Sequence, residues 1–166
     1  MSVITFKGQT IHTFGSLPPV GSACPDFRLT AVDLSDKTLK DFAGKKKILN
    51  IVPSLDTGVC QASARRFNAE AAKHLDTVVL NISADLPFAQ QRFCAAEGLT
   101  NVVNLSTMRS PEFGQDFGVR IVDGPLAGLL SRAVLVVDAD NRVRHAQQVP
   151  EIAQEPDYAA ALAALG

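Results

Sequence analysis

The stretch Val52-Pro53-Ser54-Leu55-Asp56-Thr57-Gly58-Val59-Cys60 decides the fold, because it joins an apolar run to a helical pattern through a tight turn. The run that leads into it, residues 48–52, is short, apolar and β-branched, which is typical of a buried strand. After it, apolar residues recur at helical spacing and predict a helix from about residue 59 to residue 74. Cys60 is therefore expected in the first turn of a helix.

This position favours a thiolate at Cys60, since the first turn of a helix carries unpaired backbone N–H groups and the positive end of the helix dipole. The dipole alone is a weak effect, so a stable thiolate also needs a nearby cation. In open α/β folds, ligands usually bind where strands end and helices begin. The alternative is that Cys60 is a small buried hydrophobic residue, and its position alone leaves both interpretations open.

Two neighbours of Cys60 each have an ordinary and a chemical interpretation. Thr57 is a good residue to cap the helix, and its hydroxyl is also within reach of anything that the sulfur attacks. Pro53 suits the end of a strand, and it can also shield the sulfur from water. Both residues are therefore candidates for a site around Cys60.

Length and composition indicate an ordinary globular protein. The 166 residues predict one domain, 1–166, with 46% hydrophobic and 20% charged residues. The net charge of −1 gives no electrostatic reason to expect nucleic acid or an anionic membrane as a partner. The first residues lack a basic segment followed by a long apolar one, so we expect a soluble, cytoplasmic protein.

The three cysteines, Cys24, Cys60 and Cys94, are widely spaced and odd in number, unlike a secreted disulfide framework. No cysteine or histidine pair has zinc-ligand spacing, and we expect neither a metal nor a cofactor. Two interpretations of the cysteines remain: redox or nucleophilic chemistry, and simple packing. Cys24 lies in a Gly- and Pro-rich loop, and we expect it to be a partly buried bystander.

The rest of the chain predicts alternating strands and helices. A βαβ unit made of residues 48–52, 59–74 and 78–82 implies parallel strands with a right-handed crossover. Lys45 to Lys47 are interpreted as a solvated turn before the first of these strands. The other expected elements are a hairpin at 3–14, a strand at 27–30, a helical turn at 38–44, a helix at 87–97, a strand at 102–105, a helix at 111–117, a loop at 119–129, a hairpin of 133–137 with 143–149, and a helix at 157–165. This order is thioredoxin-like: an α/β fold with an N-terminal β-hairpin and a central mixed sheet flanked by helices.

The motif Pro53-x-x-x-Thr57-x-x-Cys60 resembles the active-site motif of the peroxiredoxins, and its full form looks like their thiol peroxidase branch, the atypical two-cysteine bacterial enzymes. The resemblance extends over nearly the whole chain, and several separated motifs in the right order are more specific than one. The further stretches that carry it are Asn81-Ile82-Ser83-Ala84-Asp85-Leu86-Pro87-Phe88-Ala89-Gln90, Arg92-Phe93-Cys94, Asp123-Gly124-Pro125-Leu126 and Arg132-Ala133-Val134.

The predicted topology, together with this resemblance, makes Arg132 the candidate cation. If the strand at 133–137 lies antiparallel beside 48–52, its start is next to the end of the other strand, where the helix of Cys60 begins. An arginine before a strand is ordinarily a solvated end group. Here the convergence would supply the positive charge that the thiolate needs.

The resulting hypothesis is that Cys60 attacks a hydroperoxide and becomes a sulfenic acid. Arg132, Thr57 and the backbone N–H groups of Val59 and Cys60 would stabilise the stretched O–O bond, and Pro53 would shield the sulfur. Apolar residues near the pocket, namely Leu55, Phe88 and Phe93, would favour organic over hydrogen peroxide.

The resemblance implies that Cys94 resolves the sulfenic acid as an intramolecular Cys60–Cys94 disulfide, that thioredoxin reduces this disulfide, and that the protein is a homodimer. Bridged Cα atoms must lie within about 7 Å. Because both cysteines are expected in helices, we predict local unwinding around them on oxidation.

Two other classes stay open on the sequence. A Cys–His hydrolase would need His12, His74 or His145 beside Cys60. His74 is expected on the same helix, about 20 Å away at about 1.5 Å per residue, and the other two are expected at the surface of strands. A thioredoxin-like binding module without turnover would have a buried, unreactive Cys60.

Overall fold

The computed structural model describes residues 1–166, and its elements follow the predicted order. The strands are β1 (Ser2–Phe6), β2 (Gln9–Thr13), β3 (Leu29–Ala31), β4 (Asp36–Lys37), β5 (Lys46–Ile51), β6 (Thr77–Ser83), β7 (Val102–Ser106), β8 (Ala133–Val137) and β9 (Val143–Gln148). The helices are α1 (Gly58–Ala71), α2 (Pro87–Glu97), α3 (Glu112–Asp116) and α4 (Tyr158–Ala163), with a 3₁₀ turn η1 (Leu39–Phe42).

A seven-stranded mixed sheet forms the centre, in the order β4-β3-β7-β6-β5-β8-β9. The parallel pairing of β5 with β6 is the predicted crossover arrangement, and β7 pairs parallel with β6 on its other side. The predicted antiparallel pairing of β8 with β5 is also confirmed, with Ala133 opposite Ile51. Arg132, which directly precedes β8, is therefore carried to the end of β5 from which the chain turns into α1.

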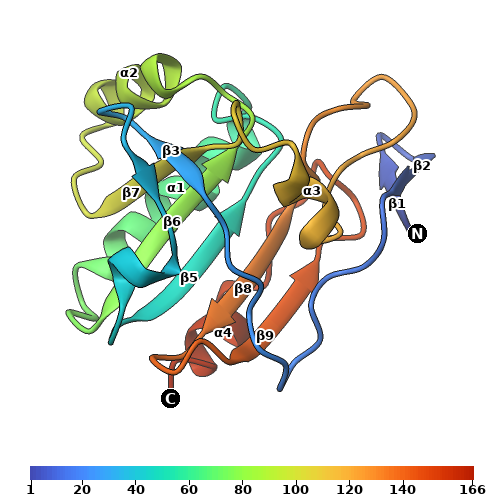
Figure 1. Cartoon of the computed structure of the whole chain (residues 1–166). Helices are drawn as coiled ribbons and strands as arrows, with labels where there is room; N and C mark the ends of the chain where they lie inside the picture. The colour runs from blue at the N-terminus through green and yellow to red at the C-terminus, as the bar shows by residue number, and fades with distance from the viewer.

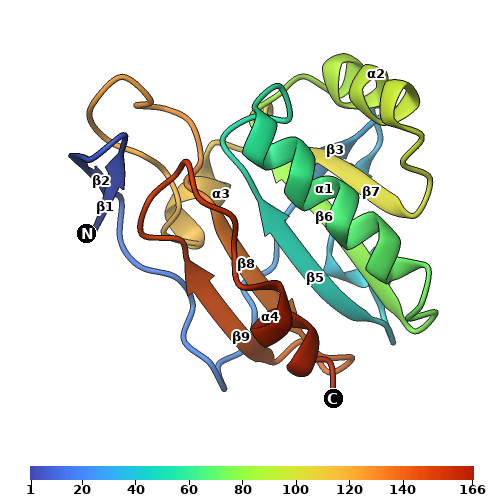
Figure 2. The same ribbon diagram turned by 180° about the vertical axis from the view of Figure 1, so that it is seen from behind.

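Helices cover both faces of this sheet, as the two opposite views show (Figures 1 and 2). On one face, Phe67 of α1 and Ala161 of α4 pack with Ile48, Val79 and Val134. α2 packs on the same face, because its Phe93 shares a cluster with Val52 and Cys60. The opposite face forms the largest apolar cluster, which includes Leu49, Leu80 and Leu135 of the sheet and Phe113 of α3.

No helix of this chain combines the length and the apolar character needed to cross a membrane.

The N-terminal hairpin of β1 and β2 forms a small sheet of its own beside the main one (Figure 1). It is tied to the loops at 121 and 151 by isolated bridges from Thr13 to Ile121 and from Thr5 to Glu151. Ile4 and Ile11 pack with Ile121 and with Ile152 in a separate apolar cluster. The hairpin therefore holds the loop that precedes β8 and the loop that follows β9.

The structure corrects two sequence predictions. α1 ends at Ala71 rather than near residue 74, so His74 lies beyond the helix. Lys47 is not part of a solvated turn, because β5 already begins at Lys46 and strand alternation turns the next side chain inward. The Lys47 side chain is fully buried, and its Nζ donates a hydrogen bond to Asn141 Oδ1 over 2.6 Å. Burial lowers the pKa of this lysine.

Candidate active site

Cys60 lies in the first turn of α1, as predicted. Thr57 is the N-cap residue, and its Oγ1 accepts a hydrogen bond from the Cys60 backbone N–H over 3.4 Å while it donates to Ser54 O over 3.3 Å. The capping interpretation of Thr57 is therefore confirmed. The Cys60 N–H, which was expected to face a peroxide, is instead bound by this cap.

The guanidinium of Arg132 lies directly beside the sulfur of Cys60. Its Nη1 donates to Cys60 Sγ over 3.2 Å, and its Nε donates to the carbonyl of Ile152 over 2.7 Å. Arg132 is 2% exposed and Cys60 is 0% exposed, so the two groups meet out of contact with water. An electrostatic contact is much stronger in such surroundings than in water.

Asp85 fixes the loop before α1, a role that its place in a sequence motif did not reveal. Its carboxylate accepts hydrogen bonds from Ser54 Oγ and from the Leu55 N–H, each over 2.7 Å. It also accepts from Ser83 Oγ over 2.8 Å. One signal could have found it: Asp85 follows the strand next to β5, at the sheet edge from which the loop starts. Asp85 is thus a positioning residue that ties residues 54–55 to the end of β6.

A cavity of about 310 Å³ lies beside Arg132, and Pro53, Thr57, Gly58, Val59 and Arg132 form part of its wall, whereas Cys60 does not line it. The wall is completed mainly by apolar side chains from the hairpin and from the loops that it holds: Phe6, Leu126, Leu129 and Ile152. The three residues expected here do not line it. Leu55 and Phe93 are buried around Cys60 in the core, and Phe88 is exposed on α2.

Cys94 lies in the last turns of α2 in a different environment. It is half-buried, and its Sγ accepts a hydrogen bond from Asn104 Nδ2 over 2.8 Å. Burial raises the pKa of this thiol, and the Asn104 hydrogen bond partly offsets that rise. Cys94 packs at the border of the apolar cluster that contains Cys60, and both cysteines are free thiols.

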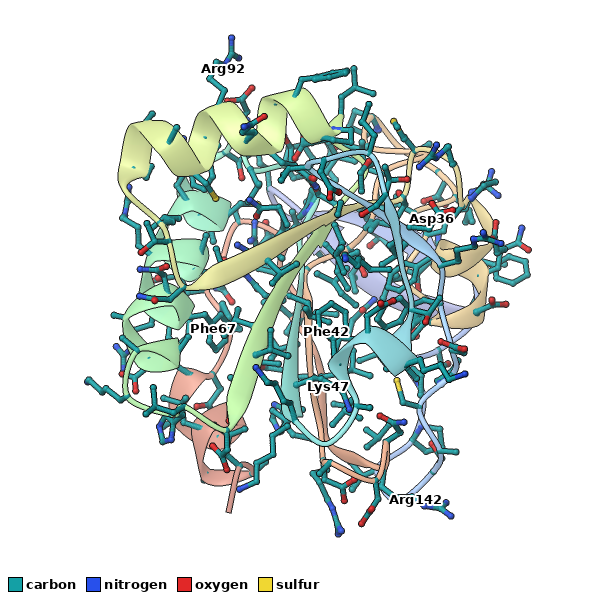
Figure 3. The ribbon with its side chains drawn as sticks, turned by 60° about the vertical axis from the view of Figure 1, so that its left-hand side comes forward. Asp36, Phe42, Lys47, Phe67, Arg92 and Arg142 are labelled. Carbon is teal, nitrogen blue, oxygen red and sulfur yellow. The ribbon has the colours of Figure 1, made fainter.

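Cys94 also faces a second cavity of about 450 Å³ between α2 and β7. The outer side of α2 faces solvent, where Arg92 extends away from the molecule, whereas Phe67 of α1 points toward the sheet (Figure 3).

None of the histidines is a hydrogen-bond partner of Cys60. His12 pairs with Asp123, with 2.6 Å between Nδ1 and Oδ2. His74 lies past the end of α1. His145 was expected at the surface but is half-buried, its Nε2 lacks a partner, and burial lowers its pKa. The geometry required for a Cys–His hydrolase is therefore missing.

Cys24, expected to be partly buried, is 7% exposed, and burial raises its pKa to about 12. No group of three or more histidine, cysteine, aspartate and glutamate side chains has the geometry to hold a metal ion.

Comparison with known proteins identifies the family. The family model described as Redoxin matches residues 19–162. A thiol peroxidase from Mycobacterium bovis (strain ATCC BAA-935 / AF2122/97) is 54% identical over 166 residues, which are 100% of this chain and 99% of that protein.

Solved structures agree with this result. A peroxiredoxin-like protein from Aquifex aeolicus superposes with a TM-score of 0.89 at 34% identity, over 96% of this chain and 92% of its own. A thiol peroxidase from Chromobacterium violaceum has a TM-score of 0.90 over 95% and 91% of the two chains, and at 24% identity it supports the fold alone. The predicted thioredoxin-like fold of the peroxiredoxin type is confirmed. Since the family model covers most of the sequence and the thiol peroxidase identity runs along its full length, this chain belongs to the redoxin family, within its thiol peroxidase branch.

Proposed function

We propose that this chain is a thiol-dependent peroxidase that reduces hydrogen peroxide and organic hydroperoxides, with Cys60 as the attacking thiolate. The observation that carries the proposal is the 3.2 Å contact between Arg132 Nη1 and Cys60 Sγ at the start of α1. Burying a guanidinium is costly unless a charged or polar partner compensates. A cysteine that only filled space in the core would not require such a partner.

In the first step, Cys60 Sγ attacks the terminal oxygen of the hydroperoxide. An S–O bond forms, the O–O bond breaks, and the leaving oxygen takes up a proton and departs as water or an alcohol. Arg132 is suited to donate to the oxygen on which negative charge develops, and this interaction strengthens in the transition state. Thr57 and Pro53 both line the cavity, and we assign to Thr57 the role of orienting the peroxide and to Pro53 that of keeping water from the sulfur.

The apolar wall of the cavity supports organic hydroperoxides as substrates. Phe6, Leu126, Leu129 and Ile152 offer a surface for a hydrocarbon group, whereas hydrogen peroxide has none. Because the Cys60 side chain is fully buried and does not line this cavity, the proposal requires the wall between them to open before a substrate reaches the sulfur.

In the second step, Cys94 Sγ attacks the sulfenic sulfur of Cys60. The S–S bond forms, the S–O bond breaks, and the hydroxide leaves as water after it takes up a proton. A dithiol reductant of the thioredoxin type then reduces the disulfide by thiol–disulfide exchange. Since both cysteines lie in helical turns, disulfide formation requires local unwinding around at least one of them.

We further propose a cytoplasmic homodimer, because a thioredoxin-type reductant is needed for turnover and because apolar side chains are exposed near the site. Leu86 and Phe88, at the start of α2, are 54% and 63% exposed. Sedimentation of the reduced protein tests the dimer: a single species at the monomer mass over a wide concentration range contradicts it.

The decisive experiment adds one equivalent of hydroperoxide to the fully reduced protein and maps the cysteines by mass spectrometry. The proposal expects the loss of two hydrogens and a peptide pair that links Cys60 to Cys94. Unmodified Cys60 after this treatment would favour the non-catalytic binding module, for which a buried, unreactive cysteine is the expected feature.

Two variants separate the roles of the cysteines. Cys60→Ser should abolish turnover, and full activity in this variant would disprove the assignment. Cys94→Ser should react once and retain a sulfenic acid that a dimedone-type reagent traps on Cys60. Cys24→Ser is the matched control, because Cys24 has no part in the proposed reaction, and its disulfide yield should equal that of the native chain.

A further inference from the structure

A row of three buried asparagines crosses the sheet between α1 and Cys94. Asn50 on β5 pairs in register with Asn81 on β6, which pairs with Asn104 on β7. The three side chains, which we call the asparagine row, are 0%, 1% and 7% exposed. Because register partners in a parallel sheet point to the same face, they lie side by side under the two helices that carry Cys60 and Cys94.

Hydrogen bonds join the whole row. Asn50 Nδ2 donates to Asn81 Oδ1 over 3.0 Å, and Asn81 Nδ2 donates to Asn104 Oδ1 over 3.4 Å. Asn104 Nδ2 then donates to Cys94 Sγ over 2.8 Å. At the other end, Asn50 Nδ2 also donates to Ser63 Oγ over 3.4 Å, and Ser63 Oγ donates to the carbonyl oxygen of Cys60 over 3.0 Å.

Burying the asparagine row is energetically unfavourable if its only role is to pack the core. Buried amides lose their hydrogen bonds to water, and the Oδ1 of Asn50 has no partner. The positions two residues before Asn50 and Asn81 on the same face are Ile48 and Val79, which pack in an apolar cluster. Apolar residues would therefore suit this face, and the amides need another explanation.

The direction of the hydrogen bonds explains why amides occupy these positions. The Ser63 hydroxyl donates its proton to the Cys60 carbonyl oxygen, so Ser63 Oγ can only accept a hydrogen bond from Asn50. The Asn50 side chain must therefore turn its NH₂ group, and not its oxygen, toward Ser63. Each later amide then accepts on one side and donates on the other. The row ends with an N–H group, rather than a carbonyl oxygen, against the sulfur of Cys94.

We propose that Asn104 is a positioning residue for Cys94, and that Asn81 and Asn50 orient its amide from the Cys60 end of α1. The inference rests on the proposed function, because it assigns a role in the resolving step. An N–H donor stabilises a thiolate more than a thiol, and the thiolate is the form of Cys94 that attacks the sulfenic sulfur. The same hydrogen bond holds Cys94 against β7 until α2 unwinds.

The test measures how fast iodoacetamide alkylates Cys94 in the reduced full-length protein, from about pH 6 to about pH 11, with peptide mass spectrometry to separate the three cysteines. In Asn104→Leu, alkylation of Cys94 at about pH 8 should slow by about three- to tenfold, the usual worth of one hydrogen bond. The titration midpoint should move to higher pH, while the rate at the alkaline plateau should not fall. The plateau reports access to the sulfur, and the midpoint reports the lost donor.

Two further variants complete the design. Asn81→Leu keeps the Asn104 donor but removes the partner that orients it, so it should move the titration midpoint in the same direction by a smaller amount. This variant also tests the proposal if Asn104→Leu does not fold. Gln91→Leu is the matched control, because Gln91 lines the same cavity as Cys94 without a hydrogen bond to its sulfur, and its midpoint should equal that of the native chain.

Unchanged midpoints in Asn104→Leu and Asn81→Leu would overturn the proposal, and so would a rise of the plateau alone, which indicates only a structural role. A shift of equal size in Gln91→Leu would also overturn it. The measurement uses no peroxide, so its failure leaves the peroxidase proposal intact. Conversely, failure of the peroxide-driven disulfide would refute the proposed function without changing this titration.

Discussion

The helices that carry the two proposed reactive cysteines are held to the sheet in different ways. α1 buries Phe67 and Ala71 in an apolar cluster and Ala64 in another, with Cys60 beside a buried arginine. α2 buries only three of its residues, Pro87, Gln90 and Phe93. Gln90, in the middle of α2, does not pack as an apolar residue but donates to Ser83 Oγ and to the Leu105 carbonyl, and its Oε1 has no partner.

This difference indicates which helix moves. The proposed Cys60–Cys94 disulfide needs Cα atoms within about 7 Å, and we infer that a helix opens locally when it forms. Few apolar contacts and a cavity of about 450 Å³ beside Cys94 make α2 the less costly one to open. Under the proposed function, Cys60 thus stays in place on α1, and Cys94 lies on the helix that opens.

Replacing Arg132 should remove most of the reactivity toward peroxide that distinguishes Cys60 from Cys94. In Arg132→Met, the rate constant for oxidation of Cys60 by peroxide should fall by about 10³-fold, because the variant loses the cation beside the sulfur and the donor to the developing oxyanion. Rapid-quench mass spectrometry of the sulfenic acid measures this rate.

Arg144→Met is the matched control, since Arg144 is exposed on the neighbouring β9 and pairs only with Asp138. Its rate constant should match that of the native chain. A decrease of less than about tenfold in Arg132→Met would mean that the guanidinium does not drive the reaction.

Hydrogen exchange can compare the two helices directly. In the reduced protein, amides in the middle of α2 should exchange about 100-fold faster than those on the buried side of α1, because α2 opens without unfolding the sheet. Mass spectrometry of exchanged peptides from residues 58–71 and 87–97 gives both rates. Equal protection of the two helices would remove the basis for assigning the motion to α2.

Asp85 connects the two regions, since its carboxylate binds the loop before α1 and it lies two residues before α2. In Asp85→Asn, one hydrogen bond to Ser54 or Leu55 is weakened and the loop loosens, so kcat/KM for peroxide should fall by about tenfold. Asp56→Asn, an exposed carboxylate in the same loop, is the control and should retain the native value. Equal kinetics in the two variants would exclude a positioning role for Asp85.

Sequence patterns could predict the part of the site that depends on topology. The antiparallel pairing of β8 with β5, expected from the thioredoxin-like order of elements together with the family resemblance, carries Arg132 to Cys60. The charge run at 45–47 gave a wrong prediction for Lys47, because β5 begins at Lys46, two residues earlier than expected, and the Lys47 side chain therefore points into the core.

Other features depend on docking between distant segments, which periodicity does not encode. The apolar wall over Arg132 comes from Phe6 on the hairpin and Leu126 on a loop, not from Phe88. The asparagine row was equally hidden, because its bonds require knowing which residues of three strands stand in register.

The smallest expected effect concerns the third cysteine. Cys24 is buried like Cys60, but neither an arginine nor an amide donates a hydrogen bond to its sulfur. Burial raises its pKa to about 12, from an ordinary value of 9.0. Its protonated form is thus favoured in the folded state, and this contribution to stability is complete below pH 9.0 and is lost as the pH rises toward about 12.

Urea unfolding of the native chain and of Cys24→Ala should therefore give a constant difference in the free energy of unfolding at and below neutral pH. Above pH 9.0 the difference should change to the disadvantage of the native chain, because only the native chain has this thiol to ionise on unfolding. A difference that is independent of pH would mean that Cys24 ionises as readily in the folded protein as in the unfolded one. Burial would then not suppress the thiolate of Cys24 against the opposing charge of Lys47, which lowers the pKa of this thiol.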